Sequence, residues 1–521
     1  MAIRKGNREQ MELMPLSIEQ YVAEDAPVRA YDAFVEALDL EALGIAIDPN
    51  KEGNPSYDPK AMLKLLVYGY SYGVRSSRKL EREAHYNLSF IWLMGGLKPD
   101  HKTIAEFRRR HKEALKKALG QCVRMCLKLD LIAGNVLFVD GSKIRANASI
   151  KNTWTMEKCQ EVLKRVDKRI EAVIAEAEAA DEEEAGLPSL VERNKEFGNA
   201  QALKKRVEAI MAELRESEKP SINTVDKECA RTNSVHGTHA GYNAQVVVDE
   251  SKGLLVSCDV VNANNDLGQF SLQIERAQAE LDKTCQIAVA DSGYADINDL
   301  AKIDKKGIQV IVPTQMAASG RKVGEFDKRN FRYNAEGNYY ICPEGKVLRY
   351  SGLTRKRKGK IYEIRNREDC LACRHFGECT SSKKGRKVMR LDEEELRERL
   401  EREYALPQNQ AIYRERQQKA EPVFGHIKSN LGVNRFLLRG VEGVRAEMAI
   451  LSLCFNLRRM ITLLGVRKLI EKLGQRLSMI ALDAASHCSI AVRTCASVSH
   501  MGKSKRPFVI SPTLKRSYDT V

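Results

Sequence analysis

Three acidic residues have the chemistry of a divalent-metal site. Asp140 ends the apolar run "NVLFVD", Asp291 ends the run "IAVAD", and Glu421 lies in a helix-like stretch farther along the chain. Carboxylate oxygens are the ligands that Mg²⁺ and Mn²⁺ prefer. Two such ions held about 3.5–4 Å apart activate the nucleophile and stabilise the leaving oxygen in phosphoryl transfer. These residues therefore predict two-metal chemistry on a phosphate ester, provided that the fold brings them together.

The segments around Asp140 and Asp291 alternate between strand-like and helix-like patterns. Strands are predicted at 135–140, 241–251, 253–262, 287–291 and 308–313, and helices at 266–283 and 297–307. This chain order is that of the ribonuclease-H-like fold, an α/β architecture in which the first and fourth strands are neighbours. Neighbouring strands lie about 5 Å apart, so two aspartates that end these strands would face the same metal ions.

The first 130 residues read as helical and carry a basic face. One helix-like stretch breaks at a glycine and restarts with Arg75 and Arg78, and a later one carries Arg108 and Arg109. Two helices with a tight break and a cationic second helix suit a helix-turn-helix reader of DNA. We predict that these four arginines contact DNA; the alternative is an ordinary solvated helical face.

Two insertions interrupt the predicted α/β core. Residues 155–217 have apolar residues at three-four spacing on both sides of a Gly-Leu-Pro break, which predicts a helical hairpin resembling an antiparallel coiled coil. A segment rich in Gly, Lys and Arg follows the last strand. The predicted parts are a helical DNA-binding domain, the first part of the catalytic core with its hairpin, a basic cysteine-containing insertion, the C-terminal helices of the core and a basic tail, at 1–130, 131–313, 314–390, 391–465 and 466–521.

The basic insertion contains a cluster of cysteines. Cys342 lies in "CPEG", and Cys370, Cys373 and Cys379 lie in "CLACRHFGEC". A CxxC pair with two further thiols can hold Zn²⁺ tetrahedrally, although the first half lacks its own CxxC. We predict a structural zinc site that this weakly apolar segment needs for its order, with His375 as a spare ligand. The alternative is a reduced, metal-free cluster.

Composition narrows the class of protein. A formal charge of +16 and a pI near 9.2 indicate a polyanionic partner, most simply nucleic acid. The 13 cysteines are mostly isolated, which fits reduced cytosolic thiols better than a disulfide framework. The sequence shows neither an apolar run that could span a bilayer nor the apolar segment of a signal peptide. We therefore expect a cytoplasmic protein that does not act at a membrane.

Five motifs in a fixed order carry a resemblance to a known family. They are "DGSKIRANAS" from Asp140, "GYNAQVVVDE", "NANNDLGQ", "ADSGYAD" and "EPVFGHIK" from Glu421. In this order they resemble the DDE-type transposases of bacterial insertion sequences, in the branch with a tyrosine, arginine, glutamate and lysine signature. The likeness covers roughly residues 10–465.

This resemblance implies a function and its site residues. The implied activity is binding of the inverted-repeat ends of an insertion sequence, Mg²⁺- or Mn²⁺-dependent strand cleavage, and strand transfer into target DNA. It also implies a homodimer in the synaptic complex and a bacterial, nucleoid-associated protein. The implied catalytic triad is Asp140, Asp291 and Glu421, and the implied DNA contacts are Tyr413, Arg416 and Lys428.

One position departs from the signature. Arg416 stands five residues before Glu421 instead of four, and Pro422 removes a helical hydrogen bond, so a local kink could absorb the extra residue.

Each acid also has an ordinary structural interpretation when it is taken singly. Asp140 could be a turn former, Asp291 a helix cap and Glu421 a surface charge on a helix. The alternative function is a domesticated transposase that binds DNA as a repressor without catalysis.

Overall fold

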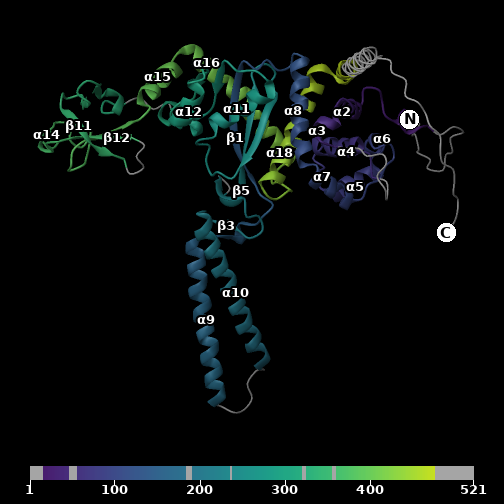
Figure 1. The fold of residues 1–521 in the computed structure, drawn as a ribbon, viewed down its shortest axis with the longest axis horizontal. Coiled ribbons are helices and arrows are strands. Elements are labelled where there is room, and N and C mark those ends of the chain that lie inside the picture. Colours follow the sequence, from purple (N-terminus) through teal and green to yellow (C-terminus); the bar gives the residue numbers. More distant parts are fainter. Residues whose placement is uncertain are drawn as a thin grey trace, which may run out of the picture.

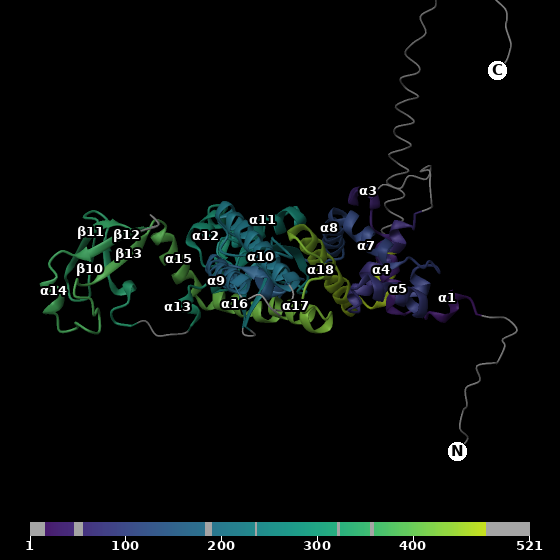
Figure 2. The ribbon, with the colours of Figure 1, turned by 90° about the horizontal axis from the view of Figure 1, so that it is seen from below.

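The computed structural model shows an elongated chain with three bodies in a row and one long projection (Figure 1). A helical body lies at one end, an α/β body lies in the centre, and a β-rich body lies at the other end, as Figure 2 also shows. The structure describes residues 16–45, 56–182, 190–234, 237–319, 324–354 and 359–475. The predicted basic tail at 466–521 therefore lies mostly outside the described residues.

The central body is built on a mixed six-stranded sheet. Its strands are β1 (Val136–Arg145), β4 (Ala230–Ser234), β5 (Gly237–Asp249), β6 (Leu255–Val261), β7 (Ile287–Val289) and β8 (Gln309–Ile311). β1 pairs antiparallel with β5 and parallel with β7, β6 pairs with β5, and β8 pairs with β7. The first and fourth strands of the predicted order are thus neighbours, which fits a ribonuclease-H-like core.

The prediction that Asp140 ends its strand is wrong. β1 continues to Arg145 and stays paired with β5 from Leu137 to Arg145. On its other edge, β1 pairs with β7 only as far as Phe138, because β7 ends at Val289. The shortness of β7, and not the end of β1, is what leaves Asp140 at an open edge.

Helices cover this sheet and join it to the helical body. They include α8 (Lys112–Lys128), α11 (Phe270–Leu281), α12 (Ile297–Asp304) and α18 (Val441–Leu464). α18 packs against α8, β6 and α4 (Pro59–Ser71), and most of its side chains are buried. Among the described residues, no single helix is long and apolar enough to cross a membrane; α18 and residues 466–475, bent by 107°, pass such a test only as a pair.

The helical body shares one continuous apolar core with the sheet. Its helices are α1 (Ile18–Tyr21), α2 (Pro27–Glu36), α3 (Leu40–Leu43), α4 (Pro59–Ser71), α5 (Ser77–Tyr86), α6 (Leu88–Leu93) and α7 (His101–Arg110). Buried side chains run without interruption from Val22 in this body to Leu473 beyond α18. Experiments on DNA binding should therefore use the full chain, because truncation after residue 130 would expose part of this core.

The long projection consists of two helices (Figure 1). They are α9 (Met156–Glu182) and α10 (Leu190–Ser217), and the turn between them lies outside the described residues. Cys159, Val207, Ile210 and Leu214 form a small core near the base, where β2 (Thr153–Trp154) pairs with β3 (Ile222–Asn223). In the part of the chain that the structure describes, the hairpin projects from the central body at this base (Figure 1).

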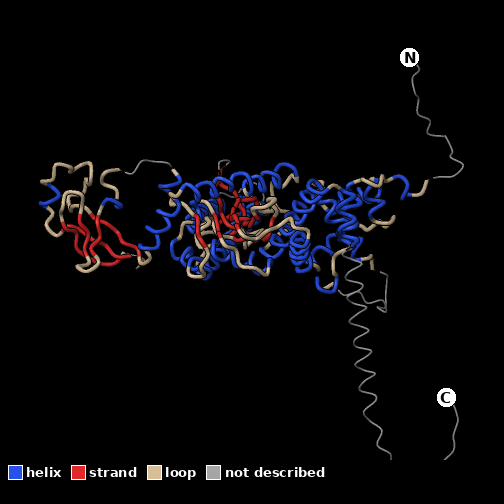
Figure 3. The backbone as a smooth tube through the Cα atoms, turned by 90° about the horizontal axis from the view of Figure 1, so that it is seen from above, coloured by secondary structure: helices blue, strands red, loops and turns tan. Residues whose placement is uncertain are grey.

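The β-rich body carries its own sheet, visible as a separate group of strands in Figure 3. Its strands are β9 (Arg332–Asn334), β10 (Tyr339–Ile341), β11 (Val347–Leu353), β12 (Gly359–Ile364) and β13 (Lys387–Leu391), joined antiparallel in that order. Phe331, Tyr340, Leu348, Tyr362 and Val388 form a buried core. The expectation that this segment has too little apolar content for a core of its own is therefore wrong, because its aromatic side chains supply one.

The chain returns from the β-rich body to the central body through helices. They are α15 (Glu394–Tyr404), α16 (Pro407–Lys419) and α17 (Glu421–Gly425), followed by a π-helical turn at His426–Asn430. The side chain of Glu394 is buried and pairs with Lys328 at 2.6 Å and with Arg397 at 2.6 Å. This ion-pair cluster anchors α15 to the segment that enters the β-rich body.

Candidate active site

Asp140 lies on β1, and Asp291 lies two residues beyond the end of the parallel neighbour β7. Val136 pairs with Ile287 and Phe138 pairs with Val289, so the same register continued by two residues sets Asp140 opposite Asp291. Side chains at matching positions of parallel strands project from the same face of the sheet. Asp291 also caps the short turn after it, because its Oδ1 accepts a hydrogen bond from the Gly293 amide at 2.8 Å.

Glu421 approaches these acids from the start of a short helix that follows an interruption at Ala420. α16 ends at Lys419, and α17 begins at Glu421 with Pro422 in its first turn. Arg416, in the last turn of α16, donates from Nη2 to Glu421 Oε1 at 2.9 Å and from Nη1 to Asp140 Oδ1 at 3.4 Å. The predicted kink is present, and Arg416 bridges the first and third acids.

The charges of these groups act on one another. Burial raises the pKa of Asp140 to about 6, the Arg416 guanidinium opposes this rise, and the charges of Asp291 and Glu421 add to it. Asp140 is 8% exposed, so its carboxylate has little water to stabilise its charge. The carboxylates of Asp140, Asp291 and Glu421, together the acid site, therefore concentrate negative charge that a cation must balance.

The residue types suit Mg²⁺ or Mn²⁺, but their arrangement is incomplete. Among the described residues, no group of three or more His, Cys, Asp and Glu side chains is positioned to hold a metal ion. The oxygen donors of three carboxylates have the right chemistry for these ions. The buried guanidinium of Arg416 stands between two of them, so the acids cannot converge while it stays there.

A polar network beside the acids was not predicted. Asp266 Oδ1 accepts from Asn243 Nδ2 at 2.8 Å and from Gln245 Nε2 at 2.7 Å, and the Tyr294 hydroxyl donates to Gln245 Oε1. A Cβ at Gly141 would meet Gln245, Asp266 and Tyr294 at 2.6–2.8 Å. The sequence signal for this network is the motif "NANND", which ends in Asp266.

Lys428 and Tyr413 also gather near β1. Lys428 Nζ donates to Ser142 Oγ at 2.5 Å, and burial lowers the pKa of Lys428 while the charge of Asp140 opposes that change. The ring of Tyr413 lies 5.7 Å from the Arg416 guanidinium. All the residues of the tyrosine, arginine, glutamate and lysine signature therefore surround one end of the sheet.

Two of the four arginines predicted to contact DNA from the helical body are structural. Arg75 is 8% exposed and donates to Glu447 Oε1 at 2.9 Å and to two backbone carbonyls, and Arg108 is 7% exposed and donates to the Tyr70 hydroxyl at 2.9 Å. Buried guanidinium groups with such partners do not face a DNA backbone, which corrects the prediction for both. Arg78 and Arg109 are exposed, although Arg109 pairs with Glu106, and DNA contact stays a prediction for them.

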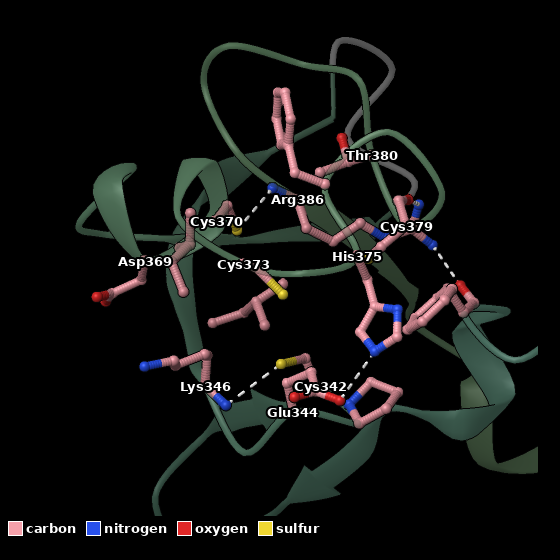
Figure 4. Close-up of a pocket in the computed structure, with 15 residues that line it drawn as sticks. Cys342, Glu344, Lys346, Asp369, Cys370, Cys373, His375, Cys379, Thr380 and Arg386 are labelled. Carbon is pink, nitrogen blue, oxygen red and sulfur yellow. Dashed lines mark hydrogen bonds and ion pairs between the residues drawn. The ribbon is translucent and has the colours of Figure 1, made fainter.

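The predicted zinc ligands all face a different cavity, in the β-rich body (Figure 4). Cys342, Cys370, Cys373 and Cys379 are free thiols that line it together with His375. This cavity is separate from the acid site, since its lining comes only from residues 326–386.

Comparisons with known proteins give two family matches. Residues 16–110 match the model of the "Transposase domain (DUF772)", and residues 341–461 match that of the "Transposase DDE domain". Both matches are to transposase domains. They support a DDE-type transposase, and the second match includes Glu421 but begins after Asp140 and Asp291.

Whole-chain comparisons add little to these matches. No curated protein was found to match the chain. A solved structure, the cryo-EM structure of the piggyBac transposase synaptic complex with hairpin DNA, is 9% identical with a TM-score of 0.32, and the alignment covers 87% of this chain and 81% of that one. Similarity at this level supports no inference about the site.

Proposed function

We propose that this chain is a DNA transposase that binds the inverted-repeat ends of an insertion sequence, cleaves the DNA strand and transfers it to target DNA. The two transposase-domain matches support the class. The observation that carries the chemistry is the register between β1 and β7, which, continued two residues past the end of β7, sets Asp291 opposite Asp140; Glu421 is linked to Asp140 through Arg416.

The chain's own residues have distinct roles in this proposal. Asp140, Asp291 and Glu421 hold divalent cations, which activate the attacking oxygen and stabilise the leaving oxygen when bound. Asp140 must be ionised to bind metal, so metal binding should weaken as the pH falls below about 6, the pKa of this carboxyl. Gly141 leaves the space that Asp266, Gln245 and Tyr294 fill beside the acids.

Basic side chains supply the contacts to DNA in this proposal. Lys428 lies beside β1 close enough to the acids to hold a phosphate near the reacting bond. Exposed Arg78 and Arg109 on the helical body bind phosphates farther along the duplex. Joining two ends requires two active sites, so we expect a homodimer on DNA, acting in the bacterial cytoplasm at the nucleoid.

A cleavage assay with the full-length protein tests the function. Labelled duplexes from the DNA flanking the coding region are incubated with Mg²⁺ or Mn²⁺, and both binding and strand cleavage are followed. The wild type should cleave, whereas Asp291→Asn should bind with similar affinity and not cleave. Asp282→Asn, a control at the left-handed C-cap of α11, should behave as wild type. Binding without cleavage by the wild type would instead identify a non-catalytic DNA-binding protein.

A further inference from the structure

We propose that Cys342, Cys370, Cys373 and Cys379 bind one structural Zn²⁺ ion in the β-rich body. The four thiols come from two separate segments and face a single cavity of about 30 Å³ (Figure 4). A cavity of this size has room for little more than one water-sized sphere. Four sulfur donors around one small cavity are the ligand set of a structural zinc site.

The loop that carries Cys342 is shaped to present its sulfur. Gly345 takes a left-handed conformation, with φ of 75°, and its amide donates to the Cys342 carbonyl at 2.9 Å. The next amide, of Lys346, donates to Cys342 Sγ at 3.2 Å. This contact fixes the direction in which the Cys342 sulfur points.

The second segment repeats this arrangement around the CxxC pair. The Arg386 amide donates to Cys370 Sγ at 3.5 Å, and Gly385 takes φ of 81° directly before it. A Cβ at Gly385 would meet an Ile364 side-chain carbon at 2.3 Å and Cys370 Sγ at 3.4 Å. Glycine at this position therefore keeps the loop close to the cysteine.

The four thiols line one small cavity, so their sulfurs lie close together. Four thiolates cannot share this space unless a cation balances them. Zn²⁺ supplies that charge, and binding it releases the thiol protons.

His375 lines the same cavity but already has other partners. Its Nε2 lies 3.2 Å from Glu344 Oε1, its Nδ1 lies 3.2 Å from Glu378 Oε2, and its ring stacks against Phe326. These contacts favour a site of four cysteines over one of three cysteines and a histidine. Zinc would draw the sulfurs to about 2.3 Å from the ion, closer than the described side chains now stand.

The ion would join two parts of the β-rich body. Cys342 and Cys379 pack against its aromatic core, whereas Cys370 and Cys373 belong to the loop that contains α14 (Glu368–Leu371). Zinc would therefore fix this loop onto a sheet that is already formed. Its removal should loosen the loop without unfolding the central body.

Metal analysis and cobalt substitution test the site on the full-length protein. Protein purified without chelator should contain about one zinc per chain, and Co²⁺ exchanged into it should show sulfur-to-metal charge transfer and tetrahedral d–d bands. Cys370→Ser combined with Cys373→Ser should lose both signals, whereas His375→Asn and the control Cys285→Ser should keep them. Cys285 is buried in the central body, outside the cluster.

Two outcomes would overturn the proposal. Zinc below a tenth of an equivalent, with no uptake of added Zn²⁺ or Co²⁺ by the chelator-treated wild type, would show an ordinary reduced cluster. Loss of zinc from His375→Asn with retention in a Cys342→Ser variant would show a different ligand set. The wild-type uptake measurement decides the question even if the double cysteine variant fails to fold.

A second inference concerns Arg416 and rests on the proposed function. We infer that Arg416 occupies the cation position of the acid site and must leave it before the three acids bind metal. Its guanidinium is 8% exposed and bridges Asp140 and Glu421. Its Nε has no hydrogen-bond partner among the described residues, so this buried position leaves one donor unsatisfied.

DNA offers this guanidinium a better set of acceptors. Arginine binds phosphate oxygens through two parallel N–H groups, a geometry that it shares with carboxylates. A DNA phosphate near the acids would therefore draw Arg416 away and free the carboxylates. DNA binding and metal binding would then strengthen one another, because each favours the same displaced position of Arg416.

Calorimetric titration of Mn²⁺ without DNA tests this inference. Arg416→Ala should bind Mn²⁺ at least tenfold more tightly than the wild type, and Asp140→Asn added to it should abolish the gain. Arg414→Ala is the control, since Arg414 is an exposed arginine on the same helix. Equal affinity of the wild type and Arg416→Ala would overturn the inference alone. Absence of Mn²⁺ binding by every variant, even with DNA, would instead count against the acid site itself.

Discussion

Replacing Asp140 by Asn should stabilise the protein near neutral pH even though it removes a proposed metal ligand. Burial holds the pKa of Asp140 at about 6, against an ordinary value of 3.8. At about 1.4 kcal/mol per pKa unit, ionising this carboxyl in the folded protein at pH 7 costs about 3 kcal/mol relative to the unfolded chain. Asn has nearly the shape of the neutral acid and avoids this cost, so the expected gain in unfolding free energy is about 2–3 kcal/mol.

The direction of the pKa shift determines how the stability difference between the wild type and Asp140→Asn changes with pH. Because the folded-state pKa is raised, the folded protein binds more protons than the unfolded chain between about pH 4 and pH 6, so the contribution of Asp140 to stability falls as the pH rises through that range. Below the unfolded pKa, both states carry the neutral acid and resemble the Asn variant. The advantage of Asp140→Asn should therefore be about 1 kcal/mol near pH 4.5, grow through pH 6 and level off near pH 7.

Scanning calorimetry in EDTA at pH 4.5, 5.5 and 7 measures this difference. The control is Asp249→Asn on the neighbouring strand, whose carboxylate accepts from the amides of Ala133 and Gly134 at 3.1 and 2.7 Å and whose replacement should destabilise. Added Mg²⁺ should raise the melting temperature of the wild type and not that of Asp140→Asn. A variant that is less stable than wild type at pH 7, or equally shifted at pH 4.5 and 7, would refute the reasoning.

Three further substitutions test other contacts. Arg75→Ala should destabilise by about 3–5 kcal/mol in urea unfolding, because it leaves the buried carboxylate of Glu447 unpaired; an unchanged midpoint would contradict this. Arg78→Ala should leave stability unchanged and reduce the salt dependence of DNA binding by about one phosphate contact, and an unaltered slope would remove this residue from the interface. Gly141→Ala should abolish cleavage, since its Cβ would lie 2.6 Å from Gln245 Nε2; full activity would show that the network can move aside.

Sequence pattern predicted the sheet because each strand and helix of the core is locally periodic. The order of elements then predicted that β1 and β7 are neighbours, and therefore that Asp140 and Asp291 lie close together. Pattern did not show that β1 continues past Asp140, because the polar run to Arg145 is held by pairing with β5 and not by burial of alternate side chains. Strand ends set by a partner strand are not visible in one segment of sequence.

The positive charge of the helical body did not reveal which of its arginines are exposed and which are buried. Arg75 and Arg78 look alike in the sequence, yet one is buried and the other exposed. The difference depends on Glu447, which lies 372 residues away along the chain and accepts the Arg75 hydrogen bond. A partner so distant in sequence leaves no local signal, and a buried arginine then reads as a basic surface.

The core of the β-rich body was not predicted, for a different reason. Its strands β9 and β10 are only three residues long, too short for alternation to stand out from the surrounding lysines, arginines and glycines. Tyr362 nevertheless packs edge to face against Tyr333 and Tyr340, whose own rings are tilted against each other, with ring centroids 5.0–5.9 Å apart. Aromatic side chains bury enough surface to make a small core from few residues, which is why average composition understated the order of this segment.

The extra residue between Arg416 and Glu421 has a structural consequence that links sequence, local structure and site. In a continuous helix, residues five apart point about 140° away from one another, so an arginine at this spacing could not reach the glutamate. The chain breaks at Ala420, and Pro422 cannot donate the hydrogen bond that would carry α16 into α17. With the helix interrupted at Ala420, the side chains of Arg416 and Glu421 meet at 2.9 Å. The longer spacing and the proline therefore work together: they place a cation between two acids whose proposed function requires that cation to give way to metal.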